Sequence, residues 1–417
     1  MLIDFLRKKL GTDDPARELA FWALLGVMAA VTFSISLFEI FVTALIILSL
    51  ASFAARREWK VFANPFFLLA GLYFSMNLAS LTQTGYWDAS LRGMFKIGEN
   101  ILLCLSAFYA VNSEEKLRKV FQWLLIVAFV TNADALIQGI TGFEPLRQRP
   151  MTAYSGETKR LTGPFSHANN FSAYLSFVVV VFLGVVHDGK RFFSRTRYSF
   201  FLLGFFIALF CLVGTYSRGA WLAVGVTFLL YAVVKRSRAL ILMVAILGVW
   251  GIFFSPPLVK NRIVTLFDFK GGSVSERREL WGESLRMVQK SPWLGLGVNT
   301  YAKNEPFYKA PDSRTDNQYA HNGYLQMMAE TGWLGLLSFL GVVGYFLTAT
   351  LSVFRKTNEI FLKTAGTALV FGILSFLIHS LTDTNLQSLL LVNTLWLAMG
   401  VAWSARELCR KSAASYS

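Results

Sequence analysis

Long apolar segments recur along this chain, and they constrain its fold more than any other feature. Runs of roughly 20 predominantly apolar residues extend from residue 19 almost to the end, and a helix needs about 20 such residues to cross a hydrocarbon core of roughly 30 Å. Hydrophobic residues make up 54% of the 417 residues and charged residues only 16%, which is too little polar surface for a soluble domain. The sequence therefore predicts an all-α integral membrane protein, with residues 1–417 forming a single polytopic domain.

The apolar runs predict about twelve transmembrane helices, of which the first two are the least clearly separated. Gly and Pro inside some runs do not exclude a span, because neighbouring helices can satisfy the freed backbone groups. We expect the helices near residues 19–36, 38–55, 64–82, 93–111, 119–140, 166–186, 199–215, 217–234, 239–255, 333–353, 364–381 and 386–405.

Basic residues gather in every second connection between these helices. The net charge of +15 could suggest nucleic acid, but the placement follows the positive-inside rule and needs no such partner. With the N-terminus inside, both termini are cytoplasmic and the stretch 256–332, between the ninth and tenth helices, is a long outer loop. The cytoplasmic clusters are Arg7/Lys8/Lys9, Arg56/Arg57/Lys60, Lys116/Arg118/Lys119, Lys190/Arg191/Arg195/Arg197, Lys235/Arg236/Arg238, Arg355/Lys356 and Arg406/Arg410/Lys411.

The outer loop is predicted to be partly helical. Ser275 precedes a carboxylate-rich turn and reads as an N-cap. A second helix is expected from about residue 319 to 330, stopped by Gly332. Loops of this length in compact proteins tend to be functional. The apolar face of the first helix is expected to contain Leu280, Trp281, Leu285 and Val288.

Four charged residues fall inside predicted spans, where a charge is costly and by default marks a pathway or a site. Lys96 and Glu99 are three residues apart and could pair, and Glu39 lies near the outer interface. Asp134 has no such explanation and stays open. For these residues, pairing or interfacial placement is favoured over catalysis.

Cysteine and metal chemistry have no support in the sequence. The three cysteines, Cys104, Cys211 and Cys409, fall in two predicted helices and the cytoplasmic tail, so they build no disulfide framework. No Asp-x-Asp pair, His-Glu-x-x-His helix or Cys/His cluster suggests a metal site. We therefore predict no metal and no other cofactor.

Arginine residues at the outer surface are the first candidates for chemistry. Arg218 lies in a very short outer turn between two spans, where it could snorkel to lipid phosphates or bind the anionic group of a substrate. Arg277 and Arg278 lie near the predicted start of the outer-loop helix, where helix N–H groups also favour an anion. A solvated basic turn paired with Glu276 or Glu279 explains the second pair equally well.

Histidine supplies the candidate for proton transfer. His321 and Asn322 open the second outer-loop helix, and the unperturbed pKa of histidine suits proton transfer near neutral pH. From the residues alone, His321 as a hydrogen-bonded residue at a helix start is as well supported as His321 as a base. His167 lies at the outer end of the sixth span, in the segment Gly163-Pro-Phe-Ser-His-Ala-Asn169-Asn170.

Three motifs together resemble the O-antigen ligase and O-antigen polymerase superfamily. They are Thr215-Tyr-Ser-Arg218-Gly-Ala-Trp221; Ser275-Glu-Arg277-Arg-Glu-Leu-Trp281 with Ser291-Pro-Trp-Leu-Gly-Leu-Gly297; and His321-Asn322 followed nine residues later by Gly332-Trp-Leu-Gly335. The third is the most specific, since it is similar to the ligase pattern of His, then Asn, Ser or Gln, then nine residues, then Gly-x-x-Gly. The segments 163–170 and 381–385 also look like family segments.

The resemblance implies a metal-independent, inverting membrane glycosyltransferase of the C type (GT-C) in the bacterial inner membrane. It implies a donor glycan on undecaprenyl diphosphate and an active site at the periplasmic face. In a ligase the acceptor is a sugar hydroxyl of the lipid A core. It carries catalytic roles to His321 as base and to Arg218 and Arg277 at the diphosphate. Substrate-binding roles are expected for Arg218, Arg277, Arg278, Asn322, His167 and Asn169.

Two other functions remain open on the sequence. A polymerase that extends the same carrier-linked chains shares fold, donor and surface with a ligase, and only the His-Asn spacing favours the ligase. A transporter or flippase for an anionic lipid would also need many helices and arginines. It predicts broken spans in two corresponding halves with charges near the midplane, whereas the basic residues here gather at one surface.

Overall fold

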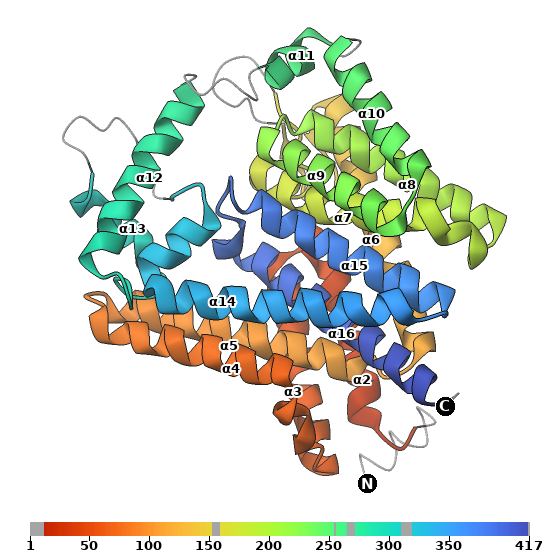
Figure 1. Cartoon of the computed structure of the whole chain (residues 1–417), viewed down its shortest axis with the longest axis horizontal. Coiled ribbons are helices and arrows are strands. Elements are labelled where there is room, and N and C mark those ends of the chain that lie inside the picture. The colour runs from red at the N-terminus through yellow and green to blue at the C-terminus, as the bar shows by residue number, and fades with distance from the viewer. Residues whose placement is uncertain (1–11, 152–158, 254–255, 265–271, 310–318, 416–417) are drawn as a thin grey trace.

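The structure, a computed structural model, describes residues 12–151, 159–253, 256–264, 272–309 and 319–415. Over these residues it is nearly all helical, with one two-stranded antiparallel hairpin (Figure 1). The strands are β1 (Phe143–Glu144) and β2 (Arg149–Pro150). The helices are α2 (Pro15–Phe33), α3 (Ile35–Arg56), α4 (Pro65–Ser80), α5 (Trp87–Ala110), α6 (Glu114–Thr141), α7 (Ala168–Asp188), α8 (Arg195–Gly214), α9 (Arg218–Lys235), α10 (Arg238–Phe253), α11 (Pro257–Val264), α12 (Gly272–Lys290), α13 (Tyr301–Asn304), α14 (Gly323–Lys356), α15 (Ile360–His379) and α16 (Leu389–Ser415).

Ten helices in the described residues are long and apolar enough to cross a membrane, and each corresponds to a predicted span. The other two predicted spans, 93–111 and 239–255, fall on α5 and α10. The 24-residue α5 carries four charged side chains, Asp88, Arg92, Lys96 and Glu99, and α10 is only 16 residues long. The multi-pass helical fold is confirmed, while the count of twelve stays a prediction.

Helices α7 and α15 form the centre of the bundle, side by side in Figure 1. Small residues allow them to approach closely: a Cβ added to Gly184 would lie 2.5 Å from the Cβ of Ala368, and one added to Gly372 would lie 2.8 Å from the Phe177 ring. Where lipid surrounds the helices, such close backbone packing stabilises their association. Most side chains of both helices are buried inside the protein.

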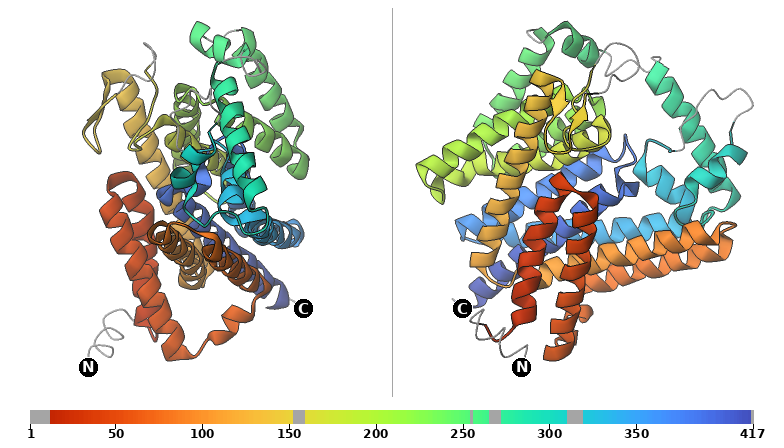
Figure 2. Two further views of the ribbon diagram at one scale, coloured as in Figure 1. Left: turned by 90° about the vertical axis from the view of Figure 1, so that its left-hand side faces the viewer. Right: turned by 180° about the vertical axis from the view of Figure 1, so that it is seen from behind.

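The remaining helices surround this pair on two sides. Helices α4 and α5 run beside α14, and α8 and α9 cover the opposite side of α7 (Figure 1). Helices α2 and α3 project together as an antiparallel pair (Figure 2). Helices α11 and α12 lie far from the C-terminal end of α16, so these two helices and the described chain ends occupy opposite ends of the molecule.

Helix α14 consists of two segments that meet at Gly332, as the sequence predicts. The backbone of Gly332 has φ +65° and ψ −170° within an otherwise helical stretch. The segment 292–297 lies across this kink: Trp333 N–H donates to the carbonyl of Pro292 at 2.8 Å, and Gly297 N–H donates to that of Glu330 at 2.9 Å. The backbone groups that the kink frees are therefore satisfied by the loop.

The outer helix α12 differs from its prediction in its start. It begins at Gly272, so Ser275 lies inside the helix and is not its N-cap. Of the residues expected in its apolar face, Leu280 and Val288 are buried, whereas Trp281 is 36% and Leu285 48% exposed. The Ser284 hydroxyl pairs with Tyr301 OH at 2.7 Å. The buried side chains are Leu280, Glu283, Ser284, Met287 and Val288.

Two charged residues within the predicted spans, Glu99 and Asp134, have hydrogen-bond partners that the sequence did not predict. In the described part of the chain no ion pair joins Lys96 to Glu99, so that predicted pairing is wrong. Glu99 accepts a hydrogen bond from the Asn393 amide at 2.8 Å instead. Asp134 accepts one from the backbone N–H of Leu146 at 3.0 Å. Asp134 thus anchors the hairpin that follows α6.

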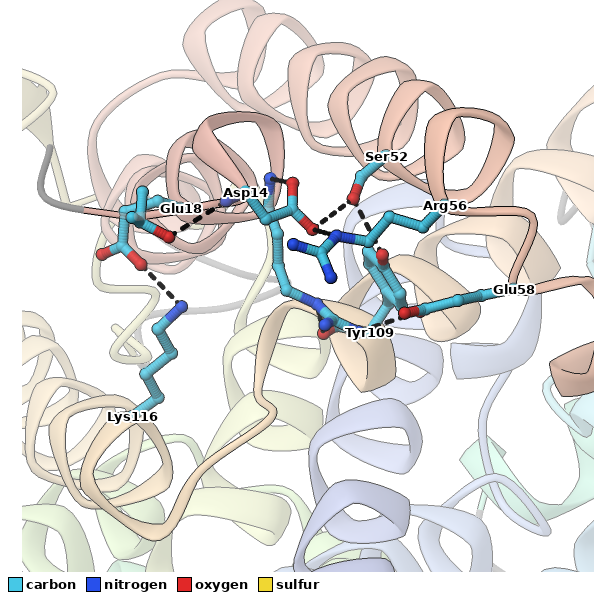
Figure 3. A network of polar contacts seen from close by, with 9 residues as sticks. Asp14, Glu18, Ser52, Arg56, Glu58, Tyr109 and Lys116 are labelled. Carbon is cyan, nitrogen blue, oxygen red and sulfur yellow. Dashed lines mark hydrogen bonds and ion pairs between the residues drawn. The ribbon is translucent and has the colours of Figure 1, made fainter. Parts of the chain in front are cut away.

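A polar network ties α2, α3 and α5 together at the end of the bundle that carries the chain ends (Figure 3). The Asp14 carboxylate caps α2 by accepting the Arg17 N–H at 3.0 Å, and it also contacts the Ser52 hydroxyl at 2.7 Å and Arg56 at 2.8 Å. The Arg17 guanidinium stacks 3.6 Å from the Tyr109 ring centroid. The packing of α2 against α3, and through Ser52 against Tyr109 of α5, is therefore stabilised by the Asp14 carboxylate.

The Asp14 network predicts a pH-dependent contribution to stability. Burial would raise the pKa of Asp14, but hydrogen bonds from Ser52 and Arg17 and the charge of Arg56 together lower it. A carboxyl group with a lowered folded-state pKa stabilises the fold above its unfolded-state pKa, and this stabilisation is lost as pH falls through the folded-state value. Asp14→Asn should therefore lower the thermal unfolding midpoint of the detergent-solubilised protein at pH 7, and the difference from wild type should shrink below about pH 4.

The exposed pair Asp88–Arg92, with a 2.8 Å contact, provides the matched control for that measurement. Asp88→Asn should change the midpoint little at any pH, because ion pairs between fully exposed side chains contribute little to stability. A difference between Asp14→Asn and wild type that is the same at pH 7 and pH 3.5 would contradict the assignment.

Candidate active site

His321 and Asp383, 62 residues apart in sequence, meet at the end of the bundle that carries α12. The Nδ1 of His321 lies 3.3 Å from Oδ1 of Asp383, and the His321 side chain is 24% exposed. A carboxylate at Nδ1 favours the tautomer with its proton on that nitrogen, which leaves Nε2 to accept another proton. His321 has φ +47°, a backbone region that side-chain-bearing residues rarely adopt. The pair is thus an oriented histidine with access to the surface.

The pair is held because the start of α14 is bonded to the α15–α16 connection. The Gly323 N–H donates to the carbonyls of Ser380 at 2.8 Å and Asp383 at 3.0 Å. The Gln387 amide donates to the Gly323 carbonyl at 2.9 Å. A Cβ at position 323 would lie 3.2 Å from the Leu386 side chain, so the glycine lets the two segments approach.

Asn322 has a structural role in this arrangement. Its side-chain oxygen accepts the N–H groups of Tyr324 at 3.1 Å and Leu325 at 3.0 Å, which makes it the N-cap of α14. The capping contribution of such a residue is about 1 kcal/mol. The amide of Asn322 fixes the first turn beside His321, and the predicted substrate-binding role remains a proposal.

Arg218 is the first residue of α9 and lies half-buried next to the connection that carries Asp383. A Cβ added to Gly219 would lie 3.1 Å from Cβ of Thr382 and 3.3 Å from the His379 ring. The turn before Arg218 depends on Tyr216, which has φ +50°. The first turn of α9 thus abuts the residues on either side of Ser380–Leu381, one position from Asp383.

Arg277, on α12, approaches the same carboxylate. Burial would raise the pKa of Asp383, but the His321 hydrogen bond and nearby positive charge, including that of Arg277, lower it. Helix α12 is fixed beside His321 because the Trp281 indole N–H donates to the carbonyl of Ala320 at 3.0 Å. Arg277 is half-buried whereas Arg278 is exposed, so the structure favours Arg277 as the inward-facing arginine.

Arg160, which the sequence did not single out, links two predicted motifs. Its guanidinium donates to the Thr215 carbonyl at 2.6 Å and to the side-chain oxygen of Asn169 at 2.9 Å. Asn169 therefore supports the turn that precedes Arg218. His167 is exposed and makes no side-chain cap to α7, and no contact in the described residues joins it to His321.

The structure therefore brings His321 and Arg277 to Asp383 and sets the first turn of α9, which begins at Arg218, against the same connection, while Arg278 and His167 stay at the surface. Nothing in the sequence assigned Asp383 a role, although it lies in one of the segments that resemble the family. A buried carboxylate in a short outer connection is the signal that could have identified it. Within the described residues, no group of three or more His, Cys, Asp or Glu side chains could hold a metal ion.

The fold and the site define a multi-pass helical membrane protein with a His–Asp pair, Arg277 and the first turn of α9 gathered at one end of the bundle. In a comparison with known protein families, residues 203–340 match the O-antigen ligase family. That segment contains Arg218, Arg277 and His321, and the predicted resemblance is confirmed over it.

A curated relative is similar to this chain over more residues than the segment 203–340. The chain is 24% identical over 308 residues to the ComP-specific O-oligosaccharyltransferase of Acinetobacter baylyi, which covers 69% of this chain. The aligned part is 52% of that relative, so this chain matches about half the length of that protein.

The hydrogen bonds that hold segment 292–297 across the kink at Gly332, called here the Gly332 clamp, can be tested by substitution. Gly332→Ala should destabilise the protein by more than about 2 kcal/mol, because φ +65° is strained for alanine and the new Cβ would collide with the backbone of Trp293. Gly341→Ala, on the same helix with no atom near the new Cβ, is the control and should be neutral. Thermal unfolding and limited proteolysis measure both; equal behaviour of the two variants would exclude the clamp.

Proposed function

We propose that this protein transfers a glycan from undecaprenyl diphosphate to a sugar hydroxyl of the lipid A core, as an O-antigen ligase at the periplasmic face of the bacterial inner membrane. The observation that carries the proposal is that His321 and Arg277 lie at Asp383 and that Arg218 begins its helix against the same connection. One end of the bundle thus presents a proton acceptor and two cations together. The match to the O-antigen ligase family supports the reaction class.

In the proposed mechanism His321 acts as the general base. Nε2 takes the proton of the acceptor hydroxyl while Asp383 holds Nδ1–H and stabilises the imidazolium that forms. The acceptor oxygen attacks the anomeric carbon of the donor sugar, and the bond from that carbon to the phosphate oxygen breaks. The electron pair leaves with the diphosphate, and attack from the opposite face inverts the anomeric centre.

The two arginines supply the electrostatic part of the mechanism. Arg218 and Arg277 hold the diphosphate oxygens, whose negative charge increases as the glycosidic bond breaks. Both are half-buried, and partial exclusion of water strengthens their interaction with an anion. Diphosphate is a good leaving group, so cationic stabilisation can replace a metal ion, and we propose a metal-independent enzyme of the GT-C type.

One observation favours a different acceptor. The curated relative is named as an oligosaccharyltransferase specific for ComP, so a second candidate function is transfer of the same carrier-linked glycan to a protein. A polymerase and a flippase are the remaining alternatives. All four share the lipid-linked donor or its headgroup and differ in the product.

The deciding experiment supplies the full-length protein, reconstituted in vesicles, with labelled glycan on undecaprenyl diphosphate and with lipid A core. The ligase proposal expects label on lipid A core, in EDTA as well as in its absence. Longer carrier-linked chains would indicate a polymerase, label on an added protein acceptor would indicate an oligosaccharyltransferase, and translocation without a new glycosidic bond would indicate a flippase.

The base assignment predicts the effect of two substitutions. His321→Ala should lower kcat by about 10²–10⁴-fold, the usual contribution of a general base. Asp383→Asn should also lower kcat, because an amide cannot favour the same tautomer or stabilise the imidazolium. His187→Gln, at the other end of α7, is the control. Unchanged turnover in His321→Ala with normal folding would remove the base from the mechanism.

The neighbouring arginines of α12 provide a matched pair. Arg277→Gln should lower kcat by about 10²-fold or more, since it removes one cation from the departing diphosphate. Arg278→Gln should change kcat less than about threefold, because Arg278 is exposed. Steady-state kinetics with labelled donor checks both, and equal losses would show that the two side chains share the role.

A further inference from the structure

A separate cavity of about 190 Å³ lies near the first turns of α3, α7 and α16, beside the β1–β2 hairpin. It is large enough for several water molecules or a phosphate group. Its wall combines two arginines, Arg147 and Arg149, with the polar side chains of Ser166, Asn170 and Ser388. None of these residues belongs to the group around Asp383.

Arg147 is held rigidly at this cavity. Its guanidinium donates to the carbonyls of Thr32 at 3.1 Å and Val31 at 2.9 Å, at the C-terminal end of α2. Burial lowers its pKa and the neighbouring charge of Arg149 lowers it further, while the charges of Glu144 and Asp134 act in the opposite direction. Arg149 thus lies next to Arg147, which is already partly desolvated, and a bound anion would reduce the repulsion between the two positive charges.

The Arg149 side chain is exposed and makes no hydrogen bond or ion pair within the described residues. Glu39 is the acidic side chain among the described residues that line the cavity. Glu144, next to Arg147, already accepts the Arg147 N–H at 2.9 Å. The positive charge therefore exceeds the negative charge at the cavity wall. The uncapped first turn of α7 adds backbone N–H groups.

The cavity lies close to the surface that lipid would contact. Ile35, in its wall, is 52% exposed, and Ile40, one turn further along α3, is 61% exposed. Large exposed apolar side chains on a membrane-spanning helix are typical of a lipid-facing surface. A ligand of this cavity can therefore keep its acyl chains in the membrane while its polar group enters the protein.

Two short connections join the cavity to the candidate active site. Asn170 follows Asn169, which bonds to Arg160 and thereby supports the turn of Arg218. Ser388 lies five residues after Asp383 and directly precedes α16. The cavity is thus built on the same connections as the active site and adjoins it.

We infer that this cavity binds the phosphate of a lipid headgroup, and that this lipid is the acceptor of the transferred glycan. The second half rests on the proposed function. Arg147 and Arg149 would hold the phosphate oxygens while the sugar part of the headgroup extends to His321. The donor diphosphate and the acceptor phosphate would then have separate sites on two sides of the α15–α16 connection.

Binding to the full-length protein in nanodiscs tests the first half without any turnover. The probes are phosphorylated lipid A core, the same glycolipid after chemical removal of its phosphates, and phosphatidylglycerol, with inorganic phosphate as a soluble competitor. The variants are Arg149→Gln, the charge-retaining Arg149→Lys and the exposed control Arg92→Gln. Arg149→Gln should weaken binding of the phosphorylated glycolipid by about tenfold or more, Arg149→Lys by less, and Arg92→Gln not at all.

The possible results separate the two halves of the inference. Equal binding of phosphorylated and dephosphorylated glycolipid, or no effect of Arg149→Gln on any probe, would overturn the phosphate site. Equal dependence on Arg149 for phosphatidylglycerol would keep the phosphate site and overturn the acceptor assignment, and competition by inorganic phosphate at equal affinity would exclude a role for the lipid. In the transfer assay, Arg149→Gln should raise the KM for acceptor and leave the KM for donor unchanged. Absence of transfer to lipid A core in wild type would instead reject the proposed function and leave the binding result standing.

Discussion

The two hydrogen bonds that Gly323 N–H donates to Ser380 and Asp383 are the contact on which the candidate site depends. They join the first turn of α14 to the connection between α15 and α16. That connection follows α15, which packs against α7 in the most buried helix pair of the bundle. Backbone groups removed from water must find partners within the protein. The requirement that makes the connection stable also fixes the position of Asp383, and through it the orientation of His321.

The site is assembled from helix ends rather than from helix interiors. Arg218 begins α9, Asn322 caps α14, Asp383 follows α15, and Trp281 of α12 is bonded to the residue before His321. The interiors of the spans supply none of these residues, but the lengths and packing of the spans place the helix ends at the same end of the bundle. Polar side chains can then gather at a surface without any charge being buried at the membrane midplane.

The sequence predicts the elements of this arrangement better than its contacts. Apolar length was sufficient to locate the spans, and Gly332 marked the break in α14 because glycine tolerates the φ that the break requires. The start of α12 was misplaced, since Ser275 resembles a cap whether or not the helix continues before it. Lys96 and Glu99 have the spacing of a helical pair, but Asn393 of a distant helix bonds to Glu99 instead. Such a competition between local and distant partners is not encoded in spacing.

The same limit applies to the site. His321, Arg218 and Arg277 were identified because their residue types and positions at the outer surface suit the chemistry. Asp383 and Arg160 were not, because each acts through a residue far away in sequence: His321 for the first, and Thr215 for the second. Positioning residues of this kind become visible only when the fold brings their partners together.

The clamp across Gly332 also bears on how such proteins can diversify. Segment 292–297 closes the outer loop back onto α14 by main-chain hydrogen bonds, which do not depend on side-chain identity. Apart from α12, whose Trp281 is hydrogen-bonded to the residue before His321, the chain between α9 and this closure can therefore change in length and composition while His321 keeps its place. Arg277 is the one proposed catalytic residue within that interval, so drift in the remainder of the loop offers a route by which related enzymes could acquire new acceptors without rebuilding their reaction centre.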